Sequence, residues 1–214
     1  MLPLFLDQLS NERRTAFKKL AAFAPPFVLA GGTAIMLQIG HRKSFDFDCF
    51  CQSETLPANL LRKIRRVLGN LIIVRRKTTE LITLVTPEQV EITLVCHPYK
   101  PLRQPIKTSG IPLFHLDDLA ANKAYTLGRR PAWRDYVDLF FFMKQKIYSI
   151  EKIIELADKK FGGEFNSRLF CQQLTYFDDV TVVETEFLKK SYTVEKIQKF
   201  LGEQVNTYLK VALS

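Results

Sequence analysis

The chain has 214 residues, which suits one domain of ordinary size or two small domains in contact. Hydrophobic residues make up 47% of it and charged residues 25%, a composition typical of globular proteins that excludes a largely disordered chain. The net charge of +9 favours a polyanionic partner, although a basic solvated surface would have the same composition. No apolar run approaches the ~18 residues of a membrane span. The N-terminus has no basic stretch before its short apolar segment, so we expect a cytoplasmic protein with no membrane association.

The four cysteines show no pair with the C-x-x-C spacing of a zinc site. They are Cys49, Cys51, Cys96 and Cys171. We expect all four to be reduced and mostly buried, which agrees with a reducing cytosol.

The first half of the chain alternates between helical and strand patterns. Helical periodicity over residues 5–23 ends at Pro25 and Pro26, because proline cannot continue a helix. The patterns that follow predict, in order, a strand over 27–29, a helix over 33–39, a strand over 44–51, a basic helix over 57–68, and strands over 71–76, 81–86 and 89–96.

Helical patterns dominate after Pro112. They predict helices over 117–127 and 131–146, and two or three more from residue 150 onward. The expected fold class is α+β. A domain with a mixed sheet occupies residues 1–112, and a helical domain occupies residues 113–214.

Two aspartates alternate with apolar residues in the expected strand over 44–51. Asp46 and Asp48 are two residues apart, so both side chains project from one face of the strand with Cα atoms ~6.5–7 Å apart. Adjacent carboxylates repel each other unless something neutralises them, and Mg²⁺ takes carboxylate oxygens as ligands. Taken alone, the pair also fits a solvent-facing strand without a function.

Gly31 and Gly32 lie between an expected strand and an expected helix. Glycine at this place lets a phosphate approach the backbone, and the helix N-terminus adds N–H donors. The hydroxyl of Thr33 is a further candidate donor. A Gly-Gly pair alone also fits an ordinary turn, but here it precedes a helix and then the strand with both aspartates.

The stretch LAGGTAIMLQIGHRKSFDFDCF, residues 29–50, closely resembles the signature of the AbiEii/AbiGii toxin family. That family belongs to the nucleotidyltransferase superfamily. The resemblance covers roughly residues 25–145 and implies a DNA-polymerase-β-like nucleotidyltransferase domain followed by a helical domain. It also implies a metal-dependent nucleotidyltransferase of a toxin–antitoxin system, with a nucleoside triphosphate (NTP) as substrate and a cognate antitoxin as partner.

The resemblance implies roles for individual residues of the first domain. Asp46 and Asp48 would be catalytic and would hold Mg²⁺ or Mn²⁺, while Glu91 is the best candidate for a third carboxylate. Glutamate at that position departs from the usual aspartate, which puts the third ligand in doubt. The implied nucleotide-binding residues are Gly31, Gly32, Thr33, Arg42 and Ser44.

A second block follows the family's order of a lysine on a helix, an arginine, and an Arg-Asp-x-x-Asp stretch. The matching residues are Lys123, Arg129 or Arg130, Arg134, Asp135 and Asp138. Lys123 would face the triphosphate as a point charge, and Asp138 would orient Lys123 or a substrate group. Arg130 and Arg134 suit bidentate contact with phosphate. Routine ion pairs on a surface helix are the alternative.

The acceptor is expected to be RNA, with the 3′ end of tRNA as the leading candidate. One candidate contact surface is the basic helix over 57–68, with cations at Arg62, Lys63, Arg65 and Arg66, which we place beside the acidic strand. Two other functions stay open. The chain could be a small-molecule nucleotidyltransferase, or a catalytically silent relative that binds nucleotide or nucleic acid.

Overall fold

The computed structural model describes residues 4–212, which form two compact units. The first runs to His115 and the second begins at Leu116, whereas the sequence analysis placed the boundary at residue 112. Each unit is described by itself. No helix in the described part of the chain is long and apolar enough to cross a membrane.

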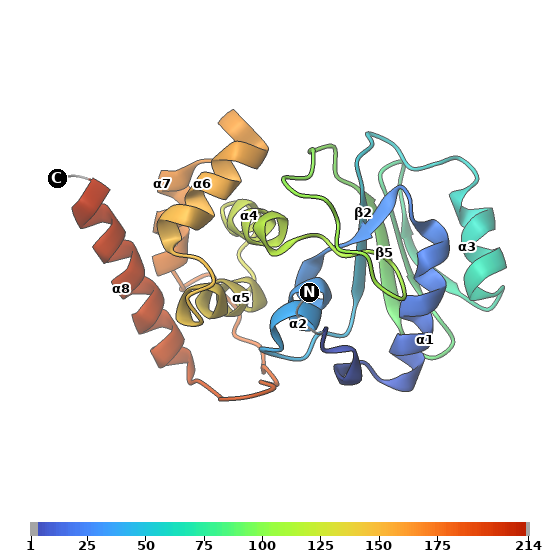
Figure 1. The fold of residues 1–214 in the computed structure, drawn as a ribbon, viewed down its shortest axis with the longest axis horizontal. Helices are drawn as coiled ribbons and strands as arrows, with labels where there is room; N and C mark the ends of the chain where they lie inside the picture. Colours follow the sequence, from blue (N-terminus) through green and yellow to red (C-terminus); the bar gives the residue numbers. More distant parts are fainter. Residues whose placement is uncertain (1–3, 213–214) are drawn as a thin grey trace. The chain divides into compact units, whose positions relative to one another are not determined.

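The first unit contains one five-stranded sheet with its helices (Figure 1). The helices are α1 (Asn11–Leu20), α2 (Gly31–Ile39) and α3 (Leu60–Leu68), with short 3₁₀ segments η1 (Leu6–Gln8) and η2 (Ala21–Phe23). The strands are β1 (Phe27–Leu29), β2 (Phe47–Cys51), β3 (Ile73–Lys77), β4 (Leu81–Val85) and β5 (Glu91–Cys96).

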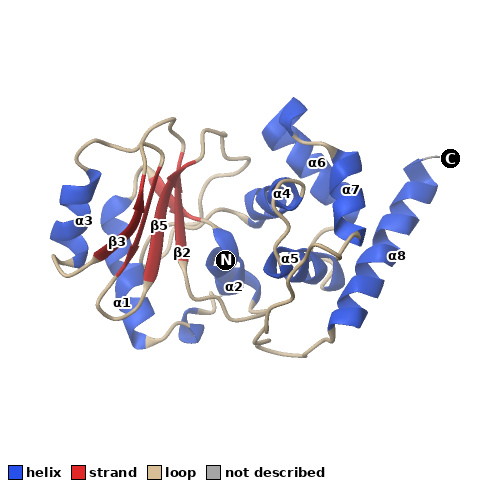
Figure 2. Ribbon diagram, turned by 180° about the vertical axis from the view of Figure 1, so that it is seen from behind, coloured by secondary structure: helices blue, strands red, loops and turns tan. Residues whose placement is uncertain are grey.

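The sheet has the strand order β1-β2-β5-β4-β3. Strands β2 and β5 are parallel, and the other three pairs are antiparallel. The expected mixed sheet is therefore confirmed. Its two central strands, β2 and β5, bring the acidic segment next to the segment that begins with Glu91 (Figure 2).

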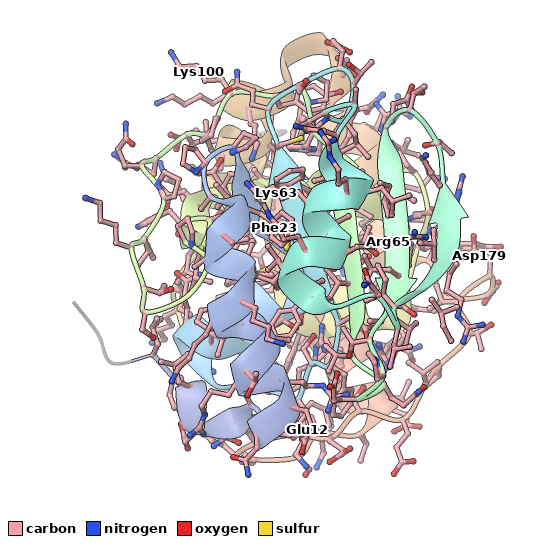
Figure 3. All side chains as sticks on the ribbon, turned by 90° about the vertical axis from the view of Figure 1, so that its right-hand side faces the viewer. Glu12, Phe23, Lys63, Arg65, Lys100 and Asp179 are labelled. Atoms are coloured by element: carbon pink, nitrogen blue, oxygen red, sulfur yellow. The ribbon has the colours of Figure 1, made fainter. Side chains whose placement is uncertain are left out.

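One face of the sheet builds the apolar core of this unit. Phe47 and Cys49 of β2 are fully buried on that face, and the ring of Phe47 lies 6.3 Å from the ring of Phe17 on α1. Helix α3 packs beside α1 over the same face. Figure 3 shows these two helices side by side, with the Lys63 ammonium 5.4 Å from the centre of the Phe23 ring. The opposite face carries Asp48, and α2 packs there against β2.

The second unit is helical. Its helices are α4 (Leu116–Leu127), α5 (Trp133–Lys144), α6 (Ile150–Phe161), α7 (Ser167–Thr175) and α8 (Val194–Ala212), with a 3₁₀ turn η3 (Gly162–Glu164). Helix α4 packs against α5 and α6, and α8 packs against α5 and α7. Aromatic rings fill much of the interior, and Phe140 lies within 5.1 Å of both Tyr192 and Phe200, measured between ring centres.

The structure differs from the expected elements chiefly at their ends. The single helix expected over residues 5–23 is three pieces, because the hydroxyl of Ser10 accepts a hydrogen bond from the Arg13 N–H and starts α1 there. Helix α2 begins at Gly31 rather than Thr33, and β2 begins at Phe47, so Asp46 precedes the strand. The alternation over 47–51 is confirmed, since Phe47, Cys49 and Cys51 are buried while Asp48 and Phe50 are half-buried.

Candidate active site

The Gly-Gly turn lies beside the acidic strand because β1 pairs with β2. Leu29 stands opposite Cys49 in this antiparallel ladder, and the Ala30 N–H donates to the carbonyl oxygen of Asp48 at 2.7 Å. The residue that follows Ala30 is the first residue of α2. Backbone hydrogen bonds thus hold the start of α2 beside Asp48.

Gly31 is a position that only glycine fits. Its φ angle is +65°, in the left-handed region that L side chains rarely adopt. A Cβ atom at Gly31 would also collide with Oδ2 of Asp48. The Asp48 carboxylate therefore lies directly against the first backbone unit of α2, with no side chain between them.

Gly32 is flanked by two polar side chains from the loop before β2. A Cβ atom at Gly32 would stand 2.6 Å from a guanidinium nitrogen of Arg42 and 2.9 Å from Oγ of Ser44. The N-cap residue of α2 is Ala30, whose side chain cannot cap the first-turn N–H groups. These N–H groups lie beside the buried Arg42 and Ser44, and this combination of donors suits a phosphate group.

Thr33 is buried and holds the acidic segment to α2. Its hydroxyl donates to the carbonyl oxygen of Asp46 at 2.5 Å and lies 3.0 Å from Oγ of Ser44. Together with the Ala30–Asp48 hydrogen bond, this contact fixes the backbone of both aspartates. Direct contact between Thr33 and a nucleotide stays a prediction, because its hydroxyl is already used within the protein.

Asp48 and Glu91 share one face of the sheet, and Asp46 lies just before β2. Asp48 stands opposite Thr93 in the parallel pair, and Glu91 lies two residues before Thr93, so strand alternation puts its exposed side chain on the same face. Among residues 4–212, however, no three acidic, histidine or cysteine side chains form a ready metal site. Asp46 and Asp48 fit Mg²⁺ or Mn²⁺ nonetheless, because Mg²⁺ is commonly held by one or two carboxylates plus substrate phosphates. Glu91 as a third ligand stays a prediction.

The basic helix does not lie where we expected it. Arg62, Arg65 and Arg66 are exposed on α3, which covers the sheet face opposite to Asp48. The placement of these cations beside the acidic strand is therefore wrong. The reason is that α3 buries Ile64 against the apolar face built by Phe47, which directs its cations away from the other face.

In the second unit, Lys123 of α4 contacts two carboxylates of α5. Its ammonium nitrogen lies 2.5 Å from Oδ1 of Asp135 and 2.7 Å from Oδ2 of Asp138. The two aspartates are three residues apart and thus share a helix face. The Lys123 side chain is 12% exposed and that of Asp138 is fully buried. The structure therefore contains the contact between Asp138 and Lys123, and adds Asp135 as a second partner that the sequence analysis did not assign.

The arginines of the second block lie in more exposed positions. Arg134 is exposed on α5, and Arg130 is exposed in the turn before it. The Arg129 guanidinium stacks 4.1 Å above the centre of the Tyr125 ring. Trp133 is buried at the start of α5. The nucleotide-binding roles of Arg130 and Arg134 stay predictions.

A buried ion pair in this unit was missed by the sequence analysis. The Lys160 ammonium nitrogen of α6 lies 2.7 Å from Oδ1 of Asp118 on α4, and both side chains are fully buried. Burial lowers the pKa of Lys160, while Asp118 opposes that shift by stabilising the charged ammonium. Asp118 lies in the first turn of α4, and no local sequence pattern relates it to Lys160.

Comparison with known proteins shows the family of this chain. Residues 16–199 match the model of a family described as "Nucleotidyl transferase AbiEii toxin, Type IV TA system". An uncharacterized protein of Aquifex aeolicus (strain VF5), aq_aa25, is 26% identical to this chain. The match covers 96% of this chain and 100% of that protein.

Two solved structures show the same fold. JHP933 from Helicobacter pylori has a TM-score of 0.57 at 18% identity, with 94% of each chain covered. MenT4, the nucleotidyltransferase toxin Rv2826c from Mycobacterium tuberculosis H37Rv, has a TM-score of 0.61 at 12% identity, covering 89% of this chain and 79% of its own. Since the family match spans most of the chain, this protein belongs to the AbiEii nucleotidyltransferase toxin family.

Proposed function

We propose that this nucleotidyltransferase transfers a nucleotide from an NTP to the 3′ end of an RNA, with tRNA as the leading candidate, and that a cognate antitoxin restrains it. One observation carries the proposal. The Asp48 carboxylate lies directly against Gly31, at the start of helix α2, whose N-cap residue Ala30 makes no side-chain cap hydrogen bond. A place for phosphate and a place for a cation are thereby adjacent, as nucleotide transfer requires.

Residues at the start of α2 and in the loop before β2 supply hydrogen-bond donors and positive charge for the triphosphate. The N–H groups at the start of α2 can donate to phosphate oxygens, and the helix dipole favours their negative charge. Arg42 and Ser44 stand beside Gly32, where they add a guanidinium and a hydroxyl. Thr33 holds the Asp46 backbone in place through its hydroxyl, so the carboxylates keep a defined position relative to this phosphate site.

Asp46 and Asp48 are the residues that would hold Mg²⁺ or Mn²⁺, with Glu91 as a further candidate. When bound, such an ion offsets the carboxylate and phosphate charges and favours the deprotonated acceptor hydroxyl. In the reaction, the 3′ oxygen of the acceptor forms a bond to the α-phosphorus, the bond to the pyrophosphate oxygen breaks, and the hydroxyl proton is lost. The protein contributes mainly positioning and electrostatic stabilisation.

The choice of an RNA acceptor is supported by charge. The net charge of +9 suits a polyanion and disfavours a cationic small molecule. A ribose 3′ end also supplies the hydroxyl that the chemistry needs. Binding through phosphates should weaken steeply with salt, because each neutralised phosphate releases counterions.

The proposal is tested by incubating the protein with each labelled NTP, Mg²⁺ or Mn²⁺, and total cellular RNA. We expect one class of RNA to become labelled by the wild type and not by Asp48→Asn. Expression of the wild type without antitoxin should arrest growth, and expression of Asp48→Asn should not. If no RNA is labelled and expression is harmless, while a small-molecule acceptor is modified, the small-molecule transferase replaces this proposal.

A further inference from the structure

A row of paired residues crosses the sheet from the acidic site to its far edge. Asp48 on β2 stands opposite Thr93 on β5, and Thr93 stands opposite Thr83 on β4. Thr83 stands opposite Arg76 on β3, the edge strand. Four successive strands thus contribute one residue each to a continuous line.

All four residues face the same side of the sheet, because residues paired across neighbouring strands share a face. The hydroxyl oxygens of Thr83 and Thr93 are 3.2 Å apart, close enough to hydrogen-bond. This side is the one opposite to α1 and α3, whose apolar contacts lie on alternate residues such as Phe47 and Leu94. With strands ~4.8 Å apart, the line from Asp48 to Arg76 spans about 14 Å between Cα atoms.

A β-bulge strengthens the positive charge at the far end of this row. The β3–β4 register shifts between Val74 and Arg76, so Arg75 is an extra residue in β3. In a bulge, two residues of one strand oppose a single residue of its partner, and here Arg75 and Arg76 oppose Thr83. Both arginines are exposed. The next residue, Lys77, is also exposed but stands opposite Ile82, whose side chain is buried on the other face.

A solvated sheet face is often polar, so polarity alone would indicate nothing. The order of the charges along this row is more informative. Carboxylates that suit a metal ion stand at one end, neutral hydroxyls stand in the middle, and guanidinium groups stand at the other end. An RNA strand has the matching order, with a reactive hydroxyl at its 3′ end and phosphates a few nucleotides upstream.

We propose that the acceptor RNA lies as a single strand along this row, defined by Asp48, Thr93, Thr83 and Arg76. The terminal ribose lies at the aspartates, the threonine hydroxyls contact the sugar–phosphate backbone, and Arg76 binds an upstream phosphate. Arginine suits that role because its planar guanidinium makes two parallel hydrogen bonds to phosphate. This inference rests on the proposed function only in taking the acceptor to be RNA.

The chain offers a matched pair of variants for the test. Arg76→Gln and Lys77→Gln each remove one exposed cation from the same strand, and only the first lies on the proposed row. Binding of a fluorescently labelled single-stranded RNA is measured by anisotropy at several salt concentrations, without NTP or added metal. We expect Arg76→Gln to weaken binding about tenfold and to reduce the salt slope by about one. Lys77→Gln should change affinity less than about twofold, in line with a cation that contacts no phosphate.

A second measurement separates this inference from the proposed function. Steady-state transfer with the double variant Thr83→Val/Thr93→Val should show a raised KM for RNA and an unchanged KM for NTP. If the wild type labels RNA but Arg76→Gln binds and labels it as well as the wild type does, RNA does not bind along this row, and the proposed function stands. If RNA binding depends on Arg76 but no RNA is labelled, the proposed RNA path along the row is retained and the proposed function fails. Equal losses of RNA affinity in Arg76→Gln and Lys77→Gln would also contradict binding along the row, since the general positive charge of the surface would then explain binding.

Discussion

Two lysine–aspartate clusters on helix α4 use the same chemical groups in different ways. Lys160 of α6 contacts the carboxylate of Asp118 on α4, and both side chains are fully buried. Lys123 of α4 itself meets two carboxylates of α5, and part of its side chain reaches the surface. One cluster thus joins α4 to α6, and the other joins α4 to α5.

The difference indicates which cluster is structural and which is a candidate for function. An ion pair whose two side chains are fully buried cannot meet a ligand, and burying its charges costs desolvation free energy, which lowers the pKa of Lys160. The Lys123 cluster is partly exposed, and its contact with the triphosphate stays a prediction. The sequence assigned a role only to Lys123, and burial separates the two lysines in the structure.

The largest expected effect concerns the two aspartates of the first unit, Asp46 and Asp48. Asp46→Asn and Asp48→Asn should each reduce the rate of nucleotide transfer by at least about 10²-fold, because removal of one electrostatic contact in an active site has an effect of that order. Thermal stability without metal should hold or rise slightly, because a like-charge repulsion is relieved. Transfer assays and thermal melts check both points. Near-normal transfer by either variant would refute the metal-site assignment.

The second prediction concerns the buried ion pair of Lys160 and Asp118. Lys160→Met leaves the Asp118 carboxylate buried without its partner, which should lower the free energy of unfolding by about 3–5 kcal/mol. The double variant Lys160→Met/Asp118→Leu should recover most of that loss, because neither buried charge remains. Urea unfolding measures the stability of both. Transfer per folded molecule should match the wild type, and a selective loss of activity would assign Lys160 a role beyond structure.

The third prediction tests the partly exposed cluster of Lys123 with Asp135 and Asp138. Lys123→Ala should weaken NTP binding about tenfold or more, since a charge-assisted contact contributes on the order of 1.5–3 kcal/mol. Calorimetry with a non-hydrolysable NTP measures the affinity, and Lys160→Met is the matched control that removes the other lysine. An unchanged affinity in Lys123→Ala would move the role to Arg129, Arg130 or Arg134.

The smallest expected effect concerns two thiols on the central strands. Cys51 and Cys96 are paired between β2 and β5, and burial, followed by the neighbouring Cys96, raises the pKa of Cys51 to about 12. Burial also raises the pKa of Cys96. The unfolded thiols ionise near pH 9, so their contribution to stability is fully present below pH 9 and is lost as the pH rises toward 12.

Thermal melts at pH 8 and pH 10 check this sign. The wild type should lose about 1 kcal/mol of stability from Cys51 between these values, and Cys51→Ala should lose less. The Cys51 thiol should also resist an aromatic disulfide reagent at pH 8 in the folded protein. An equal pH dependence in both proteins would show that other groups cause it.

Several features of this protein follow from its sequence by itself. The alternation of Phe47, Asp48 and Cys49 determines which side chains share a strand face, because that period of two is a local property of extended backbone. The order of the Gly-Gly turn, a helix and the acidic strand determines the family and the type of chemistry. The helical character of the C-terminal part is also local, since helix periodicity depends on residues three and four apart.

Tertiary structure decided the contacts between segments that are distant in the chain. Pairing of β1 with β2 places Gly31 against Asp48, and packing of α4 on α6 joins Asp118 to Lys160. It also decided that the cations of α3 lie on the far face of the sheet, while strand register places Arg76 in line with Asp48. No local period encodes such relations, because register and helix packing depend on how the whole apolar core is filled.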